Sequence, residues 1–197
     1  MLSPLKIIGL VSSLIVLASC GGGDTSSSGT YTTQNNNVTT IAGTAGVIGS
    51  ADGTAAAARF HYPFGITTDG GNLYVADTYN NTVRKIVIST GAVTTIAGTA
   101  GTTGSADATG AAATFLSPTG ITTDGTNLFL TDYGNNTVRK IVISTGAVTT
   151  IAGTAGALGS ADGTGAAATF STPFGITTDG TNLYVADTNN STIRKIY

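Results

Sequence analysis

The sequence predicts an all-β protein that repeats one small antiparallel sheet three times. The stretch V-T-T-I-A-G-T-A-G begins at Val38, Val93 and Val148, so the repeat has a period of 55 residues. The 28 Gly residues and the many Thr, Val and Ile residues favour short strands joined by tight turns. No segment shows helical periodicity except residues 55–58, which suffice for a single turn. Units that recur at a fixed period stack on their neighbours, because none buries its apolar faces alone.

The first repeat contains four short segments with strand character, each bounded by turn residues. The short connections make neighbouring strands antiparallel. Apolar residues lie on both faces of the sheet, with Leu73 and Val75 on one face and Tyr74 and Ala76 on the other. A row of such sheets packed face to face is a β-propeller, in which each sheet is one blade. In order, the predicted strands are Gly65–Asp69, Asn72–Asp77, Thr82–Ile88 and Val93–Gly98, and the predicted connections are Gly70-Gly71, Thr78–Asn81 and Ser89–Ala92.

The N-terminal segment has the pattern of an export leader. Lys6 precedes an apolar run over residues 7–18, which is too short to span a bilayer comfortably. The run ends in Leu17-Ala18-Ser19-Cys20, which resembles the bacterial lipobox, whose Cys is acylated and becomes the new N-terminus after cleavage. We therefore expect residues 1–19 to be a lipoprotein signal peptide and Cys20 to carry a lipid. An ordinary signal peptide with an incidental Cys, or an uncleaved anchor, is the alternative.

Residues 20–37 are expected to be a lipidated Cys followed by a flexible tether rich in Gly, Ser, Thr and Asn. The lipid on Cys20 would anchor the protein in a bacterial membrane. Gly21, rather than Asp, follows the Cys. By resemblance to the sorting rules of bacterial lipoproteins, this residue favours the outer membrane, with the domain facing the periplasm or the cell surface.

Composition argues against several classes of function. Eight Lys and Arg residues against ten Asp residues, with a pI of about 5.0, do not make the basic surface that nucleic-acid binding needs. A single Cys provides neither a disulfide framework nor a Cys-based metal site. One His, His61, and no Glu leave few groups for acid–base or metal chemistry. We expect no catalytic residue, no bound metal, no cofactor and no nucleic-acid partner.

The residues from the first to the third predicted strand carry a family resemblance. The segment P-F-G-I-T-T-D-G-G-N-L-Y-V-A-D-T-Y-N-N-T-V-R-K-I over residues 63–86 recurs at 118–141 and 173–196, and it resembles the NHL repeat. The resemblance implies a six-bladed β-propeller. It identifies residues 38–197 as an NHL-type domain of three repeats, which are residues 38–92, 93–147 and 148–197. Three blades are half of such a propeller.

The phase of the repeats predicts how the ring closes. The last repeat has residues for a third strand, Thr192–Ile196, and none for a fourth, whereas Val38–Gly43 is a spare fourth strand at the other end. Propellers usually have four to eight blades. We therefore expect a homodimer that completes six blades, in which each copy lends Val38–Gly43 to the other. The alternatives are an open arc of three blades and a truncated reading frame.

Acidic residues that recur in every repeat are expected to serve the blade itself. The first set, Asp69, Asp124 and Asp179, opens an Asp-Gly turn in each repeat. The second set, Asp77, Asp132 and Asp187, ends a strand, where the carboxylate can accept turn N–H groups. Arg84, Arg139 and Arg194 are expected to pair with these carboxylates.

The differences between the repeats point to one end of the blades. The fourth-to-first and second-to-third connections share this end, and their residues diverge, whereas the turns at the opposite end are nearly invariant. Loops on a rigid scaffold commonly bind partners, although tolerant loops also drift. We therefore expect a binding scaffold tethered to the membrane outside the cytoplasm, with a protein or glycan ligand. The alternative is a lactonase- or lyase-like enzyme in a six-blade ring. The candidate binding residues are Arg59, His61, Tyr62, Tyr79, Tyr133 and Asn189.

Overall fold

A computed structural model describes residues 37–197, and the fold is that of the compact unit Thr39–Tyr197. The predicted leader, Cys20 and the tether up to residue 36 lie outside the described residues. Among the described residues, no helix has the length and apolar character needed to cross a membrane.

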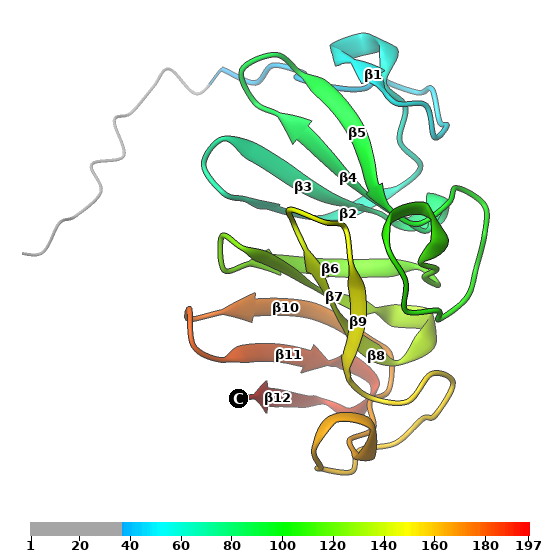
Figure 1. Ribbon diagram of the computed structural model, residues 1–197, viewed down its shortest axis with the longest axis vertical. Coiled ribbons are helices and arrows are strands. Elements are labelled where there is room, and N and C mark those ends of the chain that lie inside the picture. The colour runs from blue at the N-terminus through cyan, green and yellow to red at the C-terminus, as the bar shows by residue number, and fades with distance from the viewer. Residues whose placement is uncertain (1–36) are drawn as a thin grey trace, which may run out of the picture. The chain divides into compact units, whose positions relative to one another are not determined.

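Three antiparallel sheets make up the unit, as the repeats predict (Figure 1). The first sheet has the order β1-β5-β4-β3-β2, the second β6-β7-β8-β9, and the third β10-β11-β12. Strands of the first sheet are β1 (Gly53–Thr54), β2 (Pro63–Thr68), β3 (Asn72–Asp77), β4 (Thr82–Val87) and β5 (Ala92–Ala97). Those of the second are β6 (Pro118–Thr123), β7 (Asn127–Asp132), β8 (Thr137–Val142) and β9 (Val148–Ala152). Those of the third are β10 (Pro173–Thr178), β11 (Leu183–Asp187) and β12 (Thr192–Ile196).

Short 3-10 turns fill two connections of each repeat, and the turn predicted at residues 55–58 is confirmed as η1. The turns are η1 (Ala55–Ala57), η2 (Thr78–Asn80), η3 (Gly110–Ala112), η4 (Tyr133–Asn135), η5 (Gly165–Ala167) and η6 (Thr188–Asn190). The bounds of β2, β4 and β5 differ from the prediction by one or two residues, whereas those of β3 are as predicted. β2 begins at Pro63, because the first position of an edge strand tolerates the missing N–H of Pro. The short strand β1, which pairs with β5, is too brief to leave a pattern in the sequence.

The three sheets stack through their innermost strands, and β2, β6 and β10 lie side by side (Figure 1). Glycines allow this close approach. A Cβ atom on Gly65 would lie 2.2 Å from the carbonyl oxygen of Thr119, and one on Gly120 would lie 2.4 Å from that of Phe174. One apolar cluster, which includes Tyr74, Phe115 and Leu128, fills the space between the first two sheets. A second, around Phe170 and Val185, lies between the second and third sheets.

Each blade is braced by one Arg between two Asp side chains, as the sequence predicts for the strand-end set. In the second blade, buried Arg139 contacts Asp132 and Asp107 at 2.8 Å each. Its guanidinium also lies 5.1 Å from the centre of the Phe115 ring. The equivalent contacts of Arg84 and Arg194 repeat this arrangement. The recurring charges therefore hold loops to strands within one blade.

The two predicted sets of turn carboxylates behave differently. Asp69 accepts hydrogen bonds from the N–H groups of Gly71 and Asn72, which confirms the turn. It also accepts the hydroxyl of Tyr74 at 2.8 Å, and burial together with this carboxylate raises the pKa of Tyr74 to about 12. Asp77 accepts the side-chain N–H of Asn80, in its own turn, at 2.7 Å, as predicted. It also accepts the backbone N–H of His61 at 2.7 Å, because the carboxylate reaches across to the loop before β2.

The segment Val38–Gly43, predicted as a strand, has no strand pairing within the described residues. Its sequence matches Val93–Gly98, which includes most of β5, but in this copy Thr39–Ala42 line the outer face of the first blade and pair with no sheet edge. A strand needs such an edge to pair its backbone groups. The segment ends in a hydrogen bond from the N–H of Gly43 to the carbonyl oxygen of Ala55, at 3.0 Å.

Candidate binding face

The two divergent connections of each repeat meet at one end of the blade, as predicted. In the first blade, the N–H of Tyr79 donates to the carbonyl oxygen of His61 at 3.1 Å. The same bond joins the two loops of the other blades, from Gly134 to Leu116 and from Asn189 to Ser171. One backbone frame therefore carries three different sets of side chains.

In the first blade, this frame gathers His61, Tyr62 and Tyr79 into a group that we call the aromatic cluster. The ring centres of Tyr62 and Tyr79 are 4.8 Å apart, and that of His61 lies 5.5 Å from Tyr62 and 5.3 Å from Tyr79. These spacings are typical of interacting aromatic pairs. Tyr62 and Tyr79 are nevertheless 60% and 54% exposed. The cluster is thus an ordered apolar surface that faces solvent.

The backbone at Tyr62 is left-handed, with φ of 50°. The loop requires this conformation in every repeat, because Ser117 and Thr172 have φ of 52° and 51° at the equivalent positions. A bulky side chain is unusual at positive φ, and residues in such conformations concentrate at functional sites. The first repeat therefore places a large aromatic residue where the loop geometry does not favour one.

The other candidate residues do not join the aromatic cluster. Arg59 directs its guanidinium at the carbonyl oxygens of Ala56 and Ala58, so its charge is engaged within its own loop. Asn189 is exposed on the third blade. Tyr133, on the second blade, lies 6.1 Å from Phe174, measured between ring centres.

Tyr133 belongs to a second aromatic group, which sequence reasoning missed. Phe64 and Phe174, 53% and 42% exposed, meet edge to face with ring centres 5.7 Å apart. They come from the first and third blades and occupy equivalent positions after a Pro, where the second repeat has Thr119. The replacement of Phe by Thr in the middle repeat was the signal that would have drawn attention to this position.

Two further cavities lie on the outer sides of the terminal blades. One, of about 420 Å³, covers the face of the first blade and is lined by apolar residues that include Phe60, Ile66 and Leu73. The other, of about 650 Å³, lies beside β12 in the third blade. Within residues 37–197, no three His, Cys, Asp or Glu side chains are placed to hold a metal ion together.

Comparison with known proteins identifies the repeat. The model of the NHL repeat matches residues 60–86. Protein SUPPRESSOR OF QUENCHING 1, chloroplastic, from Arabidopsis thaliana is 35% identical over 149 residues, which are 70% of this chain and 14% of that protein. A protein of unknown function from Bacteroides thetaiotaomicron is 31% identical, with a TM-score of 0.58 over 63% of this chain and 32% of its own.

A second solved structure has the same fold. It is an auxiliary nutrient binding protein from Bacteroides thetaiotaomicron, with a TM-score of 0.61 and 21% identity, aligned over 73% of this chain and 38% of its own. The chain therefore spans well under half the length of each of these proteins.

Proposed function

We propose that this chain, which belongs to the NHL-repeat β-propeller proteins, is a binding module that takes its partner on the aromatic cluster. The observation that carries the proposal is the meeting of His61, Tyr62 and Tyr79 as exposed, mutually packed rings at one end of the first blade. The other two blades have small, aliphatic or polar residues at these positions. The cluster therefore distinguishes this blade without serving the fold that all three share.

Exposed Tyr side chains are suited to recognition. Each Tyr offers a large apolar face and a hydroxyl while losing few degrees of freedom on binding, and Tyr is enriched among residues that dominate binding energy. Tyr62 and Tyr79 are held against each other before any partner arrives, which reduces the ordering cost of association. A protein surface or the flat face of a sugar ring is the chemistry that such rings receive.

The proposal assigns no catalytic step to the chain. His61 is the single imidazole of the sequence, and its ring neighbours are two tyrosines rather than a carboxylate or a nucleophile. A general base needs a positioned partner to orient its ring and to receive a proton. The recurring carboxylates are engaged with arginines and turn N–H groups instead.

The test exchanges the cluster for residues that the same loop already carries. In the variant His61→Ser, Tyr62→Thr and Tyr79→Asn, the first blade receives the residues of the third. We expect the melting temperature to change little, since exposed substitutions usually alter stability by about 0.5 kcal/mol or less. Partners retained from envelope extracts and glycan arrays by the native chain should be lost. The control Ser89→Ala with Ser144→Ala alters exposed turns at the opposite end.

Binding that survives the triple substitution would overturn the proposal. A lowered melting temperature without loss of binding would show that the rings stabilise the loop instead.

We further propose that the module is tethered to a bacterial membrane through Cys20. The support is the Leu17–Cys20 motif behind the apolar run. Mass spectrometry of membrane-extracted protein should find an acylated N-terminal Cys20, and Cys20→Ser should abolish the modification. An unmodified Cys20 in the membrane fraction would contradict the tether.

A further inference from the structure

The third blade has an uncovered edge at β12, where the second blade has a strand. In the second blade, β9 pairs with β8, and Thr150 of β9 donates its N–H to Asp107 at 2.9 Å. The equivalent Asp162 of the third blade contacts Arg194 at 2.8 Å, and its side chain is 98% exposed, compared with 45% for Asp107. A carboxylate that binds a fourth strand in the second blade therefore faces solvent in the third.

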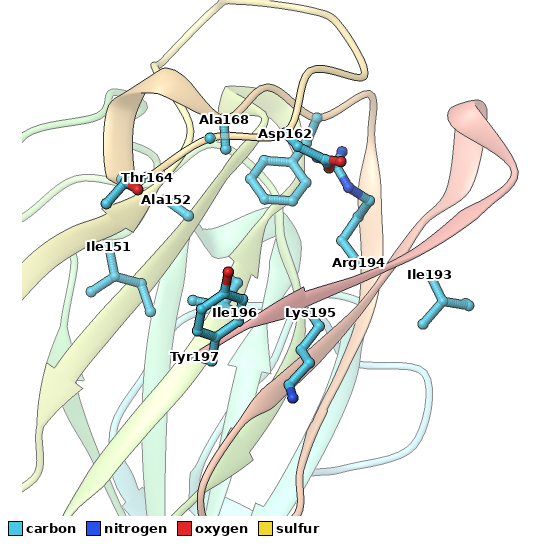
Figure 2. Close-up of a pocket in the computed structure, with 13 residues that line it drawn as sticks. Ile151, Ala152, Asp162, Thr164, Ala168, Ile193, Arg194, Lys195, Ile196 and Tyr197 are labelled. Atoms are coloured by element: carbon cyan, nitrogen blue, oxygen red, sulfur yellow. The ribbon is translucent and has the colours of Figure 1, made fainter.

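This edge borders the cavity of about 650 Å³. Figure 2 shows Asp162 and Arg194 directed toward each other at one side of it, with Ile151 and Ala152 across from Ile196. Its lining includes Asp162, Thr164 and residues of β12, whose equivalents in the second blade pair or hydrogen-bond with the fourth strand and the residue before it. Its lining thus has the polar groups to bond a strand and the apolar groups to cover its side chains.

The chain contains a segment with the sequence of that strand. Val38–Gly43 reads V-T-T-I-A-G, as do Val93–Gly98 and Val148–Gly153. Each of these three segments also enters the following blade in the same way. The N–H of Gly43 donates to Ala55, that of Gly98 to Gly110, and that of Gly153 to Gly165, all at 3.0–3.1 Å.

Val38–Gly43 therefore joins the first blade in the way that β5 joins the second blade and β9 joins the third. Thr44 repeats this arrangement, because its hydroxyl donates to Ala56 at 2.9 Å as that of Thr99 donates to Ala111 at 2.7 Å. What Val38–Gly43 lacks among the described residues is a preceding blade, whose sheet it would complete as β5 and β9 complete theirs.

The outer faces of the first and third blades expose apolar residues whose equivalents are buried where two blades meet. Ile66, on the first blade, is 59% exposed, whereas its equivalent Ile121 is 6% exposed because the first blade packs against it. Ile193, on the third blade, is 73% exposed, whereas the equivalent Val138 is fully buried against the next blade. Joining a third blade to a first blade buries both faces, and large exposed apolar patches favour such association.

We propose that Val38–Gly43 of a second copy occupies the groove beside β12 as the fourth strand of the third blade, and that the exchange is reciprocal. Thr40 of the second copy then takes the place of Thr150 and donates to Asp162. Each junction between copies repeats the junction between the first and second blades. Two-fold symmetry satisfies both open edges at once and closes a ring of six blades. The inference rests on the β12 edge and is independent of the aromatic cluster.

A designed disulfide tests the register. The pairs Thr94–Lys85 and Thr149–Lys140 are direct partners across β5–β4 and β9–β8. The proposal therefore places Thr39 opposite Lys195 of the second copy, at a Cα separation of about 4.5–5.5 Å, which a disulfide spans. The full chain with Cys20→Ser, Thr39→Cys and Lys195→Cys should oxidise to a covalent dimer on non-reducing gels.

The matched control moves one cysteine to the opposite face of β12. Thr39→Cys with Ile196→Cys should give little covalent dimer, because Ile196 packs toward the second blade. A monomer from the designed pair, or a ladder of higher oligomers in place of a dimer, would overturn the reciprocal exchange.

A single methyl group provides a second test. A Cβ atom on Gly65 would meet the backbone of the second blade at 2.2 Å, and one on Gly120 would meet that of the third at 2.4 Å. A Cβ atom on Gly175 meets only Ala186, at 3.7 Å, within this copy. In the proposed dimer, however, it would collide with the backbone of the second copy near Phe64.

Gly175→Ala, added to the disulfide pair, should therefore lower the initial rate of cross-linking by about tenfold or more while the blade stays folded. Gly71→Ala is the matched control, because its Cβ atom also has 3.7 Å of room but lies on an exposed hairpin. An unchanged rate in the Gly175→Ala chain would contradict the proposed junction.

Discussion

The second and third blades have almost the same sequence and differ in what surrounds them. In the second blade, Val138 and Arg139 are fully buried and the side chain of Asp107 is 45% exposed. In the third blade, the equivalent Ile193 is 73% exposed and the side chain of Asp162 is 98% exposed. The Arg–Asp contacts are nevertheless 2.8–2.9 Å in both. The Arg–Asp contacts are thus determined by the residues of one repeat, whereas the burial of these side chains depends on the neighbouring strand and blade.

The largest effect should come from removing the central Arg of each blade. Arg139→Ala leaves the fully buried Asp132 without its cation, and breaking a buried ion pair typically costs about 3–5 kcal/mol. Arg194→Ala should cost less, because the Arg194 side chain is 11% exposed and Asp162 is solvated. Urea unfolding, in the Gly175→Ala background that keeps the third blade uncovered, measures both losses. Equal losses would show that burial does not separate the two blades.

A smaller contrast is expected at the glycines of the inner strands. Gly120→Ala forces a Cβ atom to 2.4 Å from a backbone oxygen of the third blade, and such overpacking costs about 1–3 kcal/mol. Gly175→Ala meets no such obstacle within one copy, so it should leave the unfolding free energy of the monomer unchanged or slightly higher. Denaturation at low protein concentration compares the two. Destabilisation of the monomer by Gly175→Ala would mean that the third blade is already covered.

The smallest effect concerns acid. Burial acts to raise the pKa of Asp107, but the N–H and hydroxyl of Thr150 together with Arg139 lower it below its ordinary value of 3.8. A carboxylate with a lowered pKa stabilises the fold above that value and loses its contribution as the pH falls through the folded pKa. Asp107→Asn should therefore reduce the loss of unfolding free energy below pH 4, by about 1 kcal/mol at most.

The matched variant Asp162→Asn has no Thr contact to lose in one copy, so we expect it to change the unfolding free energy less at neutral pH. An acid profile of Asp107→Asn that coincides with the native profile would show that this carboxylate does not link the blade to the fourth strand.

Much of the fold was predictable because the repeat appears three times. Strand alternation around Leu73 and Tyr74 and the turn residues after Asp69 define β2, β3 and their hairpin without tertiary information. The pairing of β1 with β5 was not predictable, since two residues carry no periodicity. Nor was the link from Asp77 to the N–H of His61, because it depends on how the loop before β2 folds back.

The candidate site was predictable in position but not in composition. Divergence between repeats identified the end of the blade that holds Tyr62 and Tyr79, since loop bonds preserve the backbone while side chains vary. The sequence did not reveal that Arg59 turns inward, because the acceptors are main-chain oxygens. It also did not reveal that Phe64 and Phe174 meet, because contact between two blades depends on the angle at which they stack.

The position of the repeat boundary has a consequence for how such a protein changes in evolution. The units that begin at Val93 and Val148 each contribute a fourth strand to the blade before them and three strands to the blade after them, so the two parts of each unit belong to different sheets. A unit gained or lost by recombination at any Val-Thr-Thr sequence therefore carries its own connector and leaves every remaining junction intact.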